Sequence, residues 1–283
     1  MWRSLSVPNE VPATPPKSPC SKDVSHPPPL YEPVALMGSY MRHRGAALLL
    51  SALFIAACGG EPRGPTVAAA SSLRHVMPQL VTAYGKPVTV TYGASGTLRQ
   101  QIQGGAPVDL VVFASPDPVD ALIRNGFARA NTQRRLATNE LVLIAPVDSD
   151  TTASWSTLST LPHDERVAIG DPRAVPAGRY AKDAMVTLGV WENLQDRIVF
   201  AGNVAAVLAY ARRGEVAAAI VYSTDVLGLK DVQTVDRATW ADAPQPEVIG
   251  AMISTSQDAQ AFFDYIASPD GEAVLMQFGF GPA

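Results

Sequence analysis

Residues 66–113 have the sequence TVAAASSLRHVMPQLVTAYGKPVTVTYGASGTLRQQIQGGAPVDLVVF. Short apolar runs rich in β-formers alternate here with segments whose apolar residues recur at helical spacing. Strands are expected at 66–69, 88–92 and 109–113, and helices at 73–84 and 97–103. Such alternation is typical of α/β proteins with mostly parallel sheets. The stretch therefore predicts the α/β class for this chain.

The same alternation continues to the C-terminus. Further strands are expected at 141–144, 167–169, 218–222 and 248–253, and further helices at 115–123, 181–188, 204–211, 259–266 and from 269. Ser115 and Asn203 are expected to cap their helices, since both side chains can accept from a free backbone N–H group. Pro78 lies inside the first helical pattern and should kink that helix or delay its regular start. About 220 residues with this pattern suit two α/β domains.

Composition excludes several classes of protein. The chain has 283 residues, of which 47% are hydrophobic and 17% charged. It is too apolar for a disordered chain and too mixed for a polytopic membrane protein. The net charge is −4 and no block of Lys or Arg stands out, so we expect no nucleic-acid partner. Two cysteines, Cys20 and Cys58, are too few for a disulfide scaffold or a CxxC-type metal site.

The first 64 residues have the features of a processed leader. Residues 1–40 hold 9 of the 24 prolines, as in a disordered extension or a wrongly assigned start upstream of Met41. A basic stretch at 41–44 precedes the charge-free run GAALLLSALFIAA at 45–57. This run of 13 residues is too short to span a bilayer but fits the apolar region of a signal peptide.

The run ends in Ile55-Ala56-Ala57-Cys58, which resembles the lipobox of bacterial lipoproteins. In those proteins the cysteine is acylated and becomes the mature N-terminus. We therefore expect a signal peptide at 41–57, a lipid-modified Cys58, and a Gly- and Pro-rich tether at 58–64. The alternative is an ordinary buried thiol at the end of a core helix.

Small and hydroxyl residues gather where strands lead into helices. The four junctions are 70–72 (ASS), 93–97 (GASGT), 176–178 (PAG) and 202–204 (GNV). In α/β sheets, ligands bind beyond the carboxyl ends of the strands, and helix N-termini attract anions. At each single junction a plain helix cap is about as good an explanation as a ligand contact. Together the four junctions favour a site for one small ligand.

Several ordered motifs resemble the periplasmic molybdate-binding proteins of ABC importers. The matching segments are 67–73 (VAAASSL), 96–102 (GTLRQQI) with 105–110 (GAPVDL), 170–172 (GDP) with 175–178 (VPAG) and 180–182 (YAK), 220–225 (IVYSTD), and 278–280 (FGF). The resemblance covers nearly all of residues 65–283.

The resemblance implies a two-lobed, type II periplasmic binding protein fold, in which each lobe is a mostly parallel sheet flanked by helices and the ligand cleft lies between the lobes. Two chain crossings, expected near Ile144-Ala145 and Ile249-Gly250, give a first lobe of 65–143 and 249–283 and a second lobe of 144–248. The hydroxyl donors to the oxyanion would be Ser72, Ser95 and Tyr222. The backbone N–H donors would be those of Ser72, Ser95, Ala177 and Val204.

The function thus implied is that of a lipid-anchored receptor at the periplasm or the extracytoplasmic face of the membrane. It would bind molybdate, and also tungstate, for an ABC permease, as a monomer without cofactor, directly ligated metal or enzymatic activity. Arg179 would face solvent or lend positive charge at the cleft mouth. Two alternatives are a receptor for another oxyanion such as sulfate, and a regulatory effector-binding domain. The second needs a helix-turn-helix, and a signal peptide stands in its place.

Overall fold

The computed structural model describes residues 64–151 and 153–283. The predicted extension at 1–40, the signal peptide at 41–57, Cys58 and the tether up to residue 63 lie outside the described residues. Within the described ranges, no helix is both long enough and apolar enough to cross a lipid bilayer.

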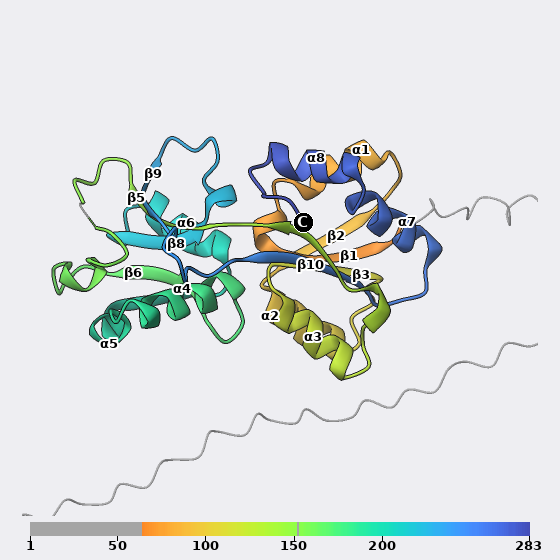
Figure 1. The fold of residues 1–283 in the computed structure, drawn as a ribbon, viewed down its shortest axis with the longest axis horizontal. Helices are drawn as coiled ribbons and strands as arrows, with labels where there is room; N and C mark the ends of the chain where they lie inside the picture. The colour runs from red at the N-terminus through yellow and green to blue at the C-terminus, as the bar shows by residue number, and fades with distance from the viewer. Residues whose placement is uncertain (1–63, 152) are drawn as a thin grey trace, which may run out of the picture. The chain divides into compact units, whose positions relative to one another are not determined.

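Two five-stranded sheets organise the described chain (Figure 1). The first has the order β2-β1-β3-β10-β4 and consists of β1 (Thr66–Ala70), β2 (Thr89–Gly93), β3 (Leu110–Phe113), β4 (Arg134–Thr138) and β10 (Glu247–Met252). The second has the order β7-β6-β8-β5-β9 and consists of β5 (Leu141–Pro146), β6 (Val167–Gly170), β7 (Ile198–Ala201), β8 (Ala218–Tyr222) and β9 (Val232–Arg237). In each sheet one strand, β10 or β5, runs antiparallel to both of its neighbours.

Each sheet and its helices form one lobe. The first lobe carries α1 (Met77–Tyr84), α2 (Ser95–Gln103), α3 (Pro116–Arg124), α7 (Gln257–Ile266) and α8 (Pro269–Gln277). The second lobe carries α4 (Pro176–Thr187), α5 (Trp191–Leu194) and α6 (Val204–Arg212). In Figure 1, α2 and α3 lie below the first sheet, and α1, α7 and α8 lie above it. This architecture confirms the predicted α/β class and the division into two lobes.

The central strands of the first sheet, β1, β3 and β10, bury both of their faces. Neighbouring residues in β3 belong to separate apolar clusters: Val111 packs with α2 and α3 residues such as Leu98, whereas Val112 belongs to the larger core. Successive side chains of a strand point to opposite faces, so a strand covered by helices on both sides must be apolar throughout. This explains the continuous apolar runs in the sequence.

The predicted chain crossings are wrong by a few residues. β5 belongs wholly to the second lobe, where Leu141 pairs with Tyr222, so the first crossing lies at Asn139-Glu140 rather than near Ile144. The second crossing occupies residues 238–246, because β10 already belongs to the first lobe from Glu247 onward. An apolar strand has the same composition whichever sheet receives it, so the hydrophobic pattern could not locate the crossings.

The expectation for Pro78 is confirmed. A short 3₁₀ helix, η1 (Ser71–Leu73), follows β1, and regular α1 begins only at Met77, with Pro78 in its first turn. Proline lacks a backbone N–H group, and the first-turn N–H groups have no partner within the helix in any case. Residues 71–73 consequently form an independent turn at the end of β1.

Candidate functional site

The five predicted ligand residues line one cavity between the lobes. The cavity is narrow: only about 10 Å³ is open to the centre of a water-sized sphere, far below the roughly 300–1,000 Å³ of pockets for drug-sized ligands. Its walls are formed by Ala70, Ser71, Ser72, Gly93, Ala94, Ser95, Ala114, Val175, Pro176, Ala177, Val204 and Tyr222. Chain segments far apart in the sequence therefore meet at a space suited to a small ligand.

From the first lobe, the turns after β1 and β2 contribute serines. Ser95 is the first residue of α2 and is fully buried, and its Oγ accepts a hydrogen bond from the N–H of Ala114 at 3.3 Å. A hydroxyl that accepts from one side keeps its own proton available to donate elsewhere. Ser72 lies in η1 and is 5% exposed. Ala94, not Ser95, is the N-cap of α2, so the interpretation of Ser95 as a plain cap is wrong.

From the second lobe, the N-termini of α4 and α6 face the cavity. Pro176 opens α4 and has no N–H group, so the first backbone donor of that helix is Ala177. Asn203 caps α6, as predicted: its side chain accepts from Ala206 N–H at 3.0 Å and leaves the N–H of Val204 uncapped. Helix N-termini also carry partial positive charge, which favours an anion.

Close packing places the start of α4 against its sheet. A Cβ atom at Gly178 would collide with the backbone of Gly170 at the end of β6. Only glycine allows this approach, which brings the first turn of α4 beside the carboxyl ends of the strands. The predicted Pro-Ala-Gly motif at 176–178 thus has a physical reason: it removes one donor, presents the next and permits the contact.

Tyr222 ends β8 with its ring fully enclosed. Its Oη lies 3.5 Å from the carbonyl oxygen of Ala114 in the opposite lobe, a long hydrogen bond that a better acceptor could replace. Burial raises the pKa of Tyr222 well above its usual value, so the hydroxyl stays protonated and can donate at neutral pH. Its backbone N–H donates to Asp225 Oδ2 at 3.0 Å, which holds the end of the strand.

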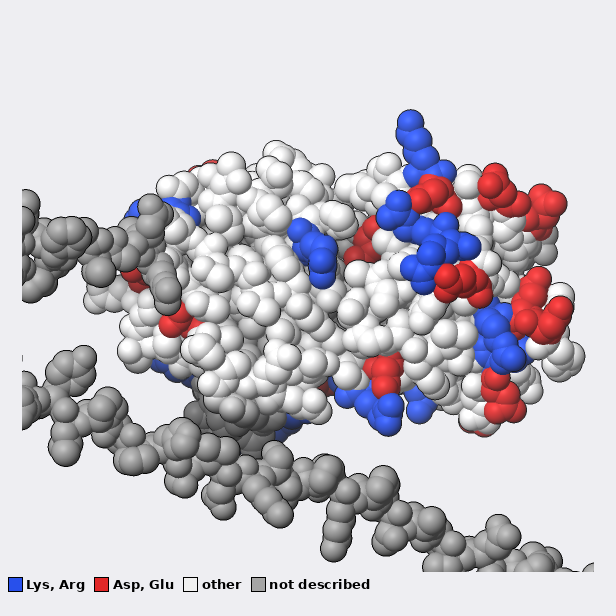
Figure 2. Space-filling model, turned by 180° about the vertical axis from the view of Figure 1, so that it is seen from behind, with Lys and Arg blue, Asp and Glu red and all other residues white. Residues whose placement is uncertain are grey.

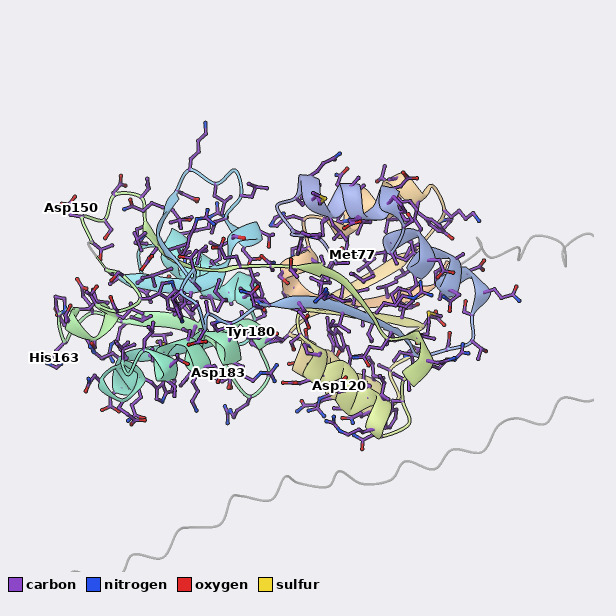
Figure 3. The ribbon with its side chains drawn as sticks, viewed as in Figure 1. Met77, Asp120, Asp150, His163, Tyr180 and Asp183 are labelled. Atoms are coloured by element: carbon purple, nitrogen blue, oxygen red, sulfur yellow. The ribbon has the colours of Figure 1, made fainter. Side chains whose placement is uncertain are left out.

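Asp225 is itself buried, and its burial raises the pKa of this carboxyl to about 7. It does not line the cavity. Burial also raises the pKa of Tyr180, on α4, to about 12. Figure 3 shows Tyr180 on the second lobe near its boundary with the first.

Ser71 also lines the cavity, although the sequence analysis predicted only its neighbour Ser72 as a ligand residue. It is 6% exposed, and its buried Oγ has no hydrogen-bond partner. The signal available in the sequence was a second hydroxyl in the same strand-to-helix junction. Sequence could not show which of the two adjacent serines faces the cavity, and the structure places both on its wall.

The lobes contact each other directly around the cavity. The N–H of Gly96 donates to the carbonyl oxygen of Ala174 at 2.9 Å. Arg179 of α4 reaches α3 of the first lobe, where Nη1 lies 2.6 Å from Asp117 Oδ2 and Nη2 donates to Ser115 Oγ at 3.1 Å. Arg179 is therefore engaged across the cleft and does not simply face solvent. Ser115 was expected to cap its helix, but its side chain makes no capping bond and accepts from Arg179 instead.

None of the described residues that line the cavity has a charged side chain. On the face that Figure 2 shows, Lys and Arg side chains stand among Asp and Glu side chains and form no single basic patch. Among residues 64–151 and 153–283, no three His, Cys, Asp or Glu side chains are grouped closely enough to hold a metal ion. His163 lies at the outer end of the second lobe (Figure 3). The cavity offers neutral N–H and O–H donors, an arrangement suited to a small anion.

Comparisons with known proteins agree with this architecture. Residues 65–281 match the family described as bacterial extracellular solute-binding protein. The chain is 32% identical to the "Putative ABC transporter substrate-binding lipoprotein YvgL" of Bacillus subtilis (strain 168), over 83% of this chain and 95% of the relative. It is also 32% identical to the molybdate-binding protein ModA of Escherichia coli (strain K12), over 76% of this chain and 88% of the relative.

A solved structure shares the fold. The periplasmic molybdate-binding protein of Azotobacter vinelandii superposes with a TM-score of 0.67 at 21% identity, over 77% of this chain and 99% of the other. At that identity the likeness concerns the fold alone. The resemblance drawn from the sequence motifs is confirmed, and so is the prediction of a binding protein rather than an enzyme. The chain belongs to the bacterial extracellular solute-binding proteins.

Proposed function

We propose that this protein is a lipid-anchored extracytoplasmic receptor that binds molybdate, accepts tungstate, and delivers the anion to the membrane permease of an ABC importer. One observation carries the proposal: a small buried cavity between two lobes, lined by N–H and O–H donors and by no charged group. Relatives named as molybdate-binding proteins and as an ABC transporter substrate-binding lipoprotein support it. The receptor would act as a monomer, because one chain supplies both walls of the cavity.

The proposed donor set predicts which anions the cavity accepts. Phosphate near neutral pH carries a proton that needs an acceptor, and no carboxylate lines the cavity. A buried polar group left unpaired costs about 1–3 kcal/mol, so phosphate should be rejected. Sulfate has the charge of molybdate but is smaller, so in a rigid cage it should reach fewer of the donors at once. Losing one such bond, worth about 1.5–3 kcal/mol to a charged acceptor, gives molybdate at least a roughly tenfold advantage.

Calorimetric titration of the purified protein with molybdate, tungstate, sulfate and phosphate tests the proposal. We expect tight binding of molybdate and tungstate, which have nearly the same size and charge, weaker binding of sulfate and none of phosphate. Sulfate binding as tight as molybdate binding would make the protein a general receptor for tetrahedral oxyanions. Binding of none of the four anions would refute the proposal.

Anchoring through Cys58 rests on the lipobox and on the lipoprotein named among the relatives. Expressed from Met41 in a bacterial host, the protein should incorporate labelled fatty acid and partition into membranes. Cys58→Ser should prevent acylation and leave the chain soluble or unprocessed. One acyl chain binds membranes only marginally, so stable anchoring requires two or more. Equal partitioning of the two forms, without label, would contradict the anchor.

A further inference from the structure

Ser71 is a buried cavity residue whose hydroxyl has no hydrogen-bond partner among the described residues. It is 6% exposed, it lines the cavity between the lobes, and its Oγ is buried without a hydrogen-bond partner. Five side-chain nitrogen or oxygen atoms of the described residues share that unpartnered state, and only the Ser71 hydroxyl belongs to a cavity-lining residue. Buried polar groups in folded proteins are normally paired, so each exception calls for an explanation.

A purely structural role does not supply one. Ala70, not Ser71, is the N-cap of η1, and no side-chain cap bond is present there. Another buried serine of the cavity wall, Ser95, already has a backbone partner. An unpaired buried hydroxyl costs free energy, and alanine at this position would avoid that cost without leaving a sizeable void.

We propose that Ser71 is a further ligand residue of this chain, whose hydroxyl donates a hydrogen bond to an oxygen of the bound oxyanion and is satisfied only when the anion is present. This inference rests on the proposed function. It adds a donor to the set of Ser72, Ser95, Ala177, Val204 and Tyr222. The short turn of η1 sets Ser71 directly beside Ser72, so two adjacent hydroxyl-bearing residues stand on one wall of the cavity.

The extra donor bears on selectivity. A tetrahedral dianion presents four oxygens, and a fixed cage discriminates by how many donors those oxygens reach together. A bond between a hydroxyl and a charged acceptor is about twice as strong as a bond between neutral groups. Removing Ser71 Oγ should therefore weaken molybdate and tungstate binding roughly tenfold or more.

Ser71→Ala, with Ser268→Ala as its control, tests the proposal by calorimetry and thermal unfolding of the full chain. Ser268 Oγ accepts from Gly271 N–H at 3.3 Å and donates to the Tyr265 carbonyl at 2.7 Å, at the start of α8 and away from the cavity. Ser71→Ala should lose affinity while the unliganded protein unfolds at an unchanged or higher temperature. Ser268→Ala should show the opposite: a lower unfolding temperature with parental affinity.

Each other outcome overturns the inference in a recognisable way. If the parent binds molybdate and Ser71→Ala binds it equally tightly, Ser71 is no ligand and the proposed function stands. If Ser71→Ala lowers the unfolding temperature of the unliganded protein as Ser268→Ala does, the hydroxyl is structural. If the parent binds none of the four anions, the proposed function fails and the inference with it.

Discussion

Arg179→Met should weaken molybdate binding although Arg179 does not line the cavity. Its guanidinium belongs to α4 of the second lobe, and its two partners, Asp117 and Ser115, belong to the first lobe. These bonds join the lobes in the structure, and lobe separation would break them. The substitution should therefore shift the protein toward an open form, which lacks one wall of the site.

The expected loss of affinity depends on how exposed the side chains of these bonds are. The side chains of Arg179 and Asp117 are 33% and 60% exposed, so their ion pair is worth only about 0.2–1 kcal/mol after solvent screening. Because Arg179 is partly exposed, its bond to the buried Ser115 hydroxyl adds about 1 kcal/mol, less than the roughly 1.5–3 kcal/mol of a hydrogen bond to a fully buried charge. Together they favour closure by roughly 1–2 kcal/mol, a factor of about 5–30. If the unliganded protein is mostly open, the apparent affinity for molybdate falls by this whole factor.

The assay pairs calorimetry with solution scattering, and Arg212→Met is the control. Arg212 forms an ion pair of similar exposure with Asp231, with Nε 2.6 Å from Oδ2, but both residues belong to the second lobe. Arg179→Met should bind molybdate about 5–30 times more weakly and should have a larger radius of gyration at subsaturating ligand. Arg212→Met should match the parent in both measurements. Parental affinity and size for Arg179→Met would refute the reasoning.

Three further substitutions have defined outcomes. Gly96→Ala would set a Cβ atom 2.6 Å from the carbonyl oxygen of Ala174 in the other lobe, so it should oppose closure of the lobes and weaken molybdate binding. A Cβ atom at Gly202 would have no atom within 4 Å, so Gly202→Ala should bind molybdate normally in the same calorimetric titration. Ser95→Ala removes a proposed ligand donor and also the acceptor of the Ala114 backbone N–H. We expect at least tenfold weaker molybdate binding by calorimetry, and a free energy of unfolding lower by about 1 kcal/mol in denaturant titrations. Parental affinity would remove Ser95 from the site. Burial raises the pKa of Asp225 from 3.8 to about 7, so the native state keeps this proton to a higher pH than the unfolded chain does. The free energy of unfolding should therefore fall by up to roughly 4 kcal/mol as the pH rises from 4 to 7. Asp225→Asn should flatten this pH dependence in urea titrations.

Much of the fold was predictable because it depends on local patterns. The apolar runs of β1, β3 and β8 and the helical spacing of α1 and α7 match the structure, as does the cap at Asn203. Strands β4, β7 and β9 were not predicted. Polar and charged residues weaken the hydrophobic signal of β4 and β9, and β7 is apolar but only four residues long. Pairing with a neighbouring strand fixes all three as strands.

The sequence by itself determined the α/β class, the family resemblance and the junction residues that line the cavity, since each depends on residues close together in the chain. Tertiary structure alone decided that β5 joins the second lobe, that Arg179 bonds to Asp117 across the cleft, and that Ser71 Oγ is left without a partner. The physical reason is the same in all three cases. Pairing across sheets, lobes and cavities joins groups far apart in sequence, and neither composition nor periodicity specifies which of them meet.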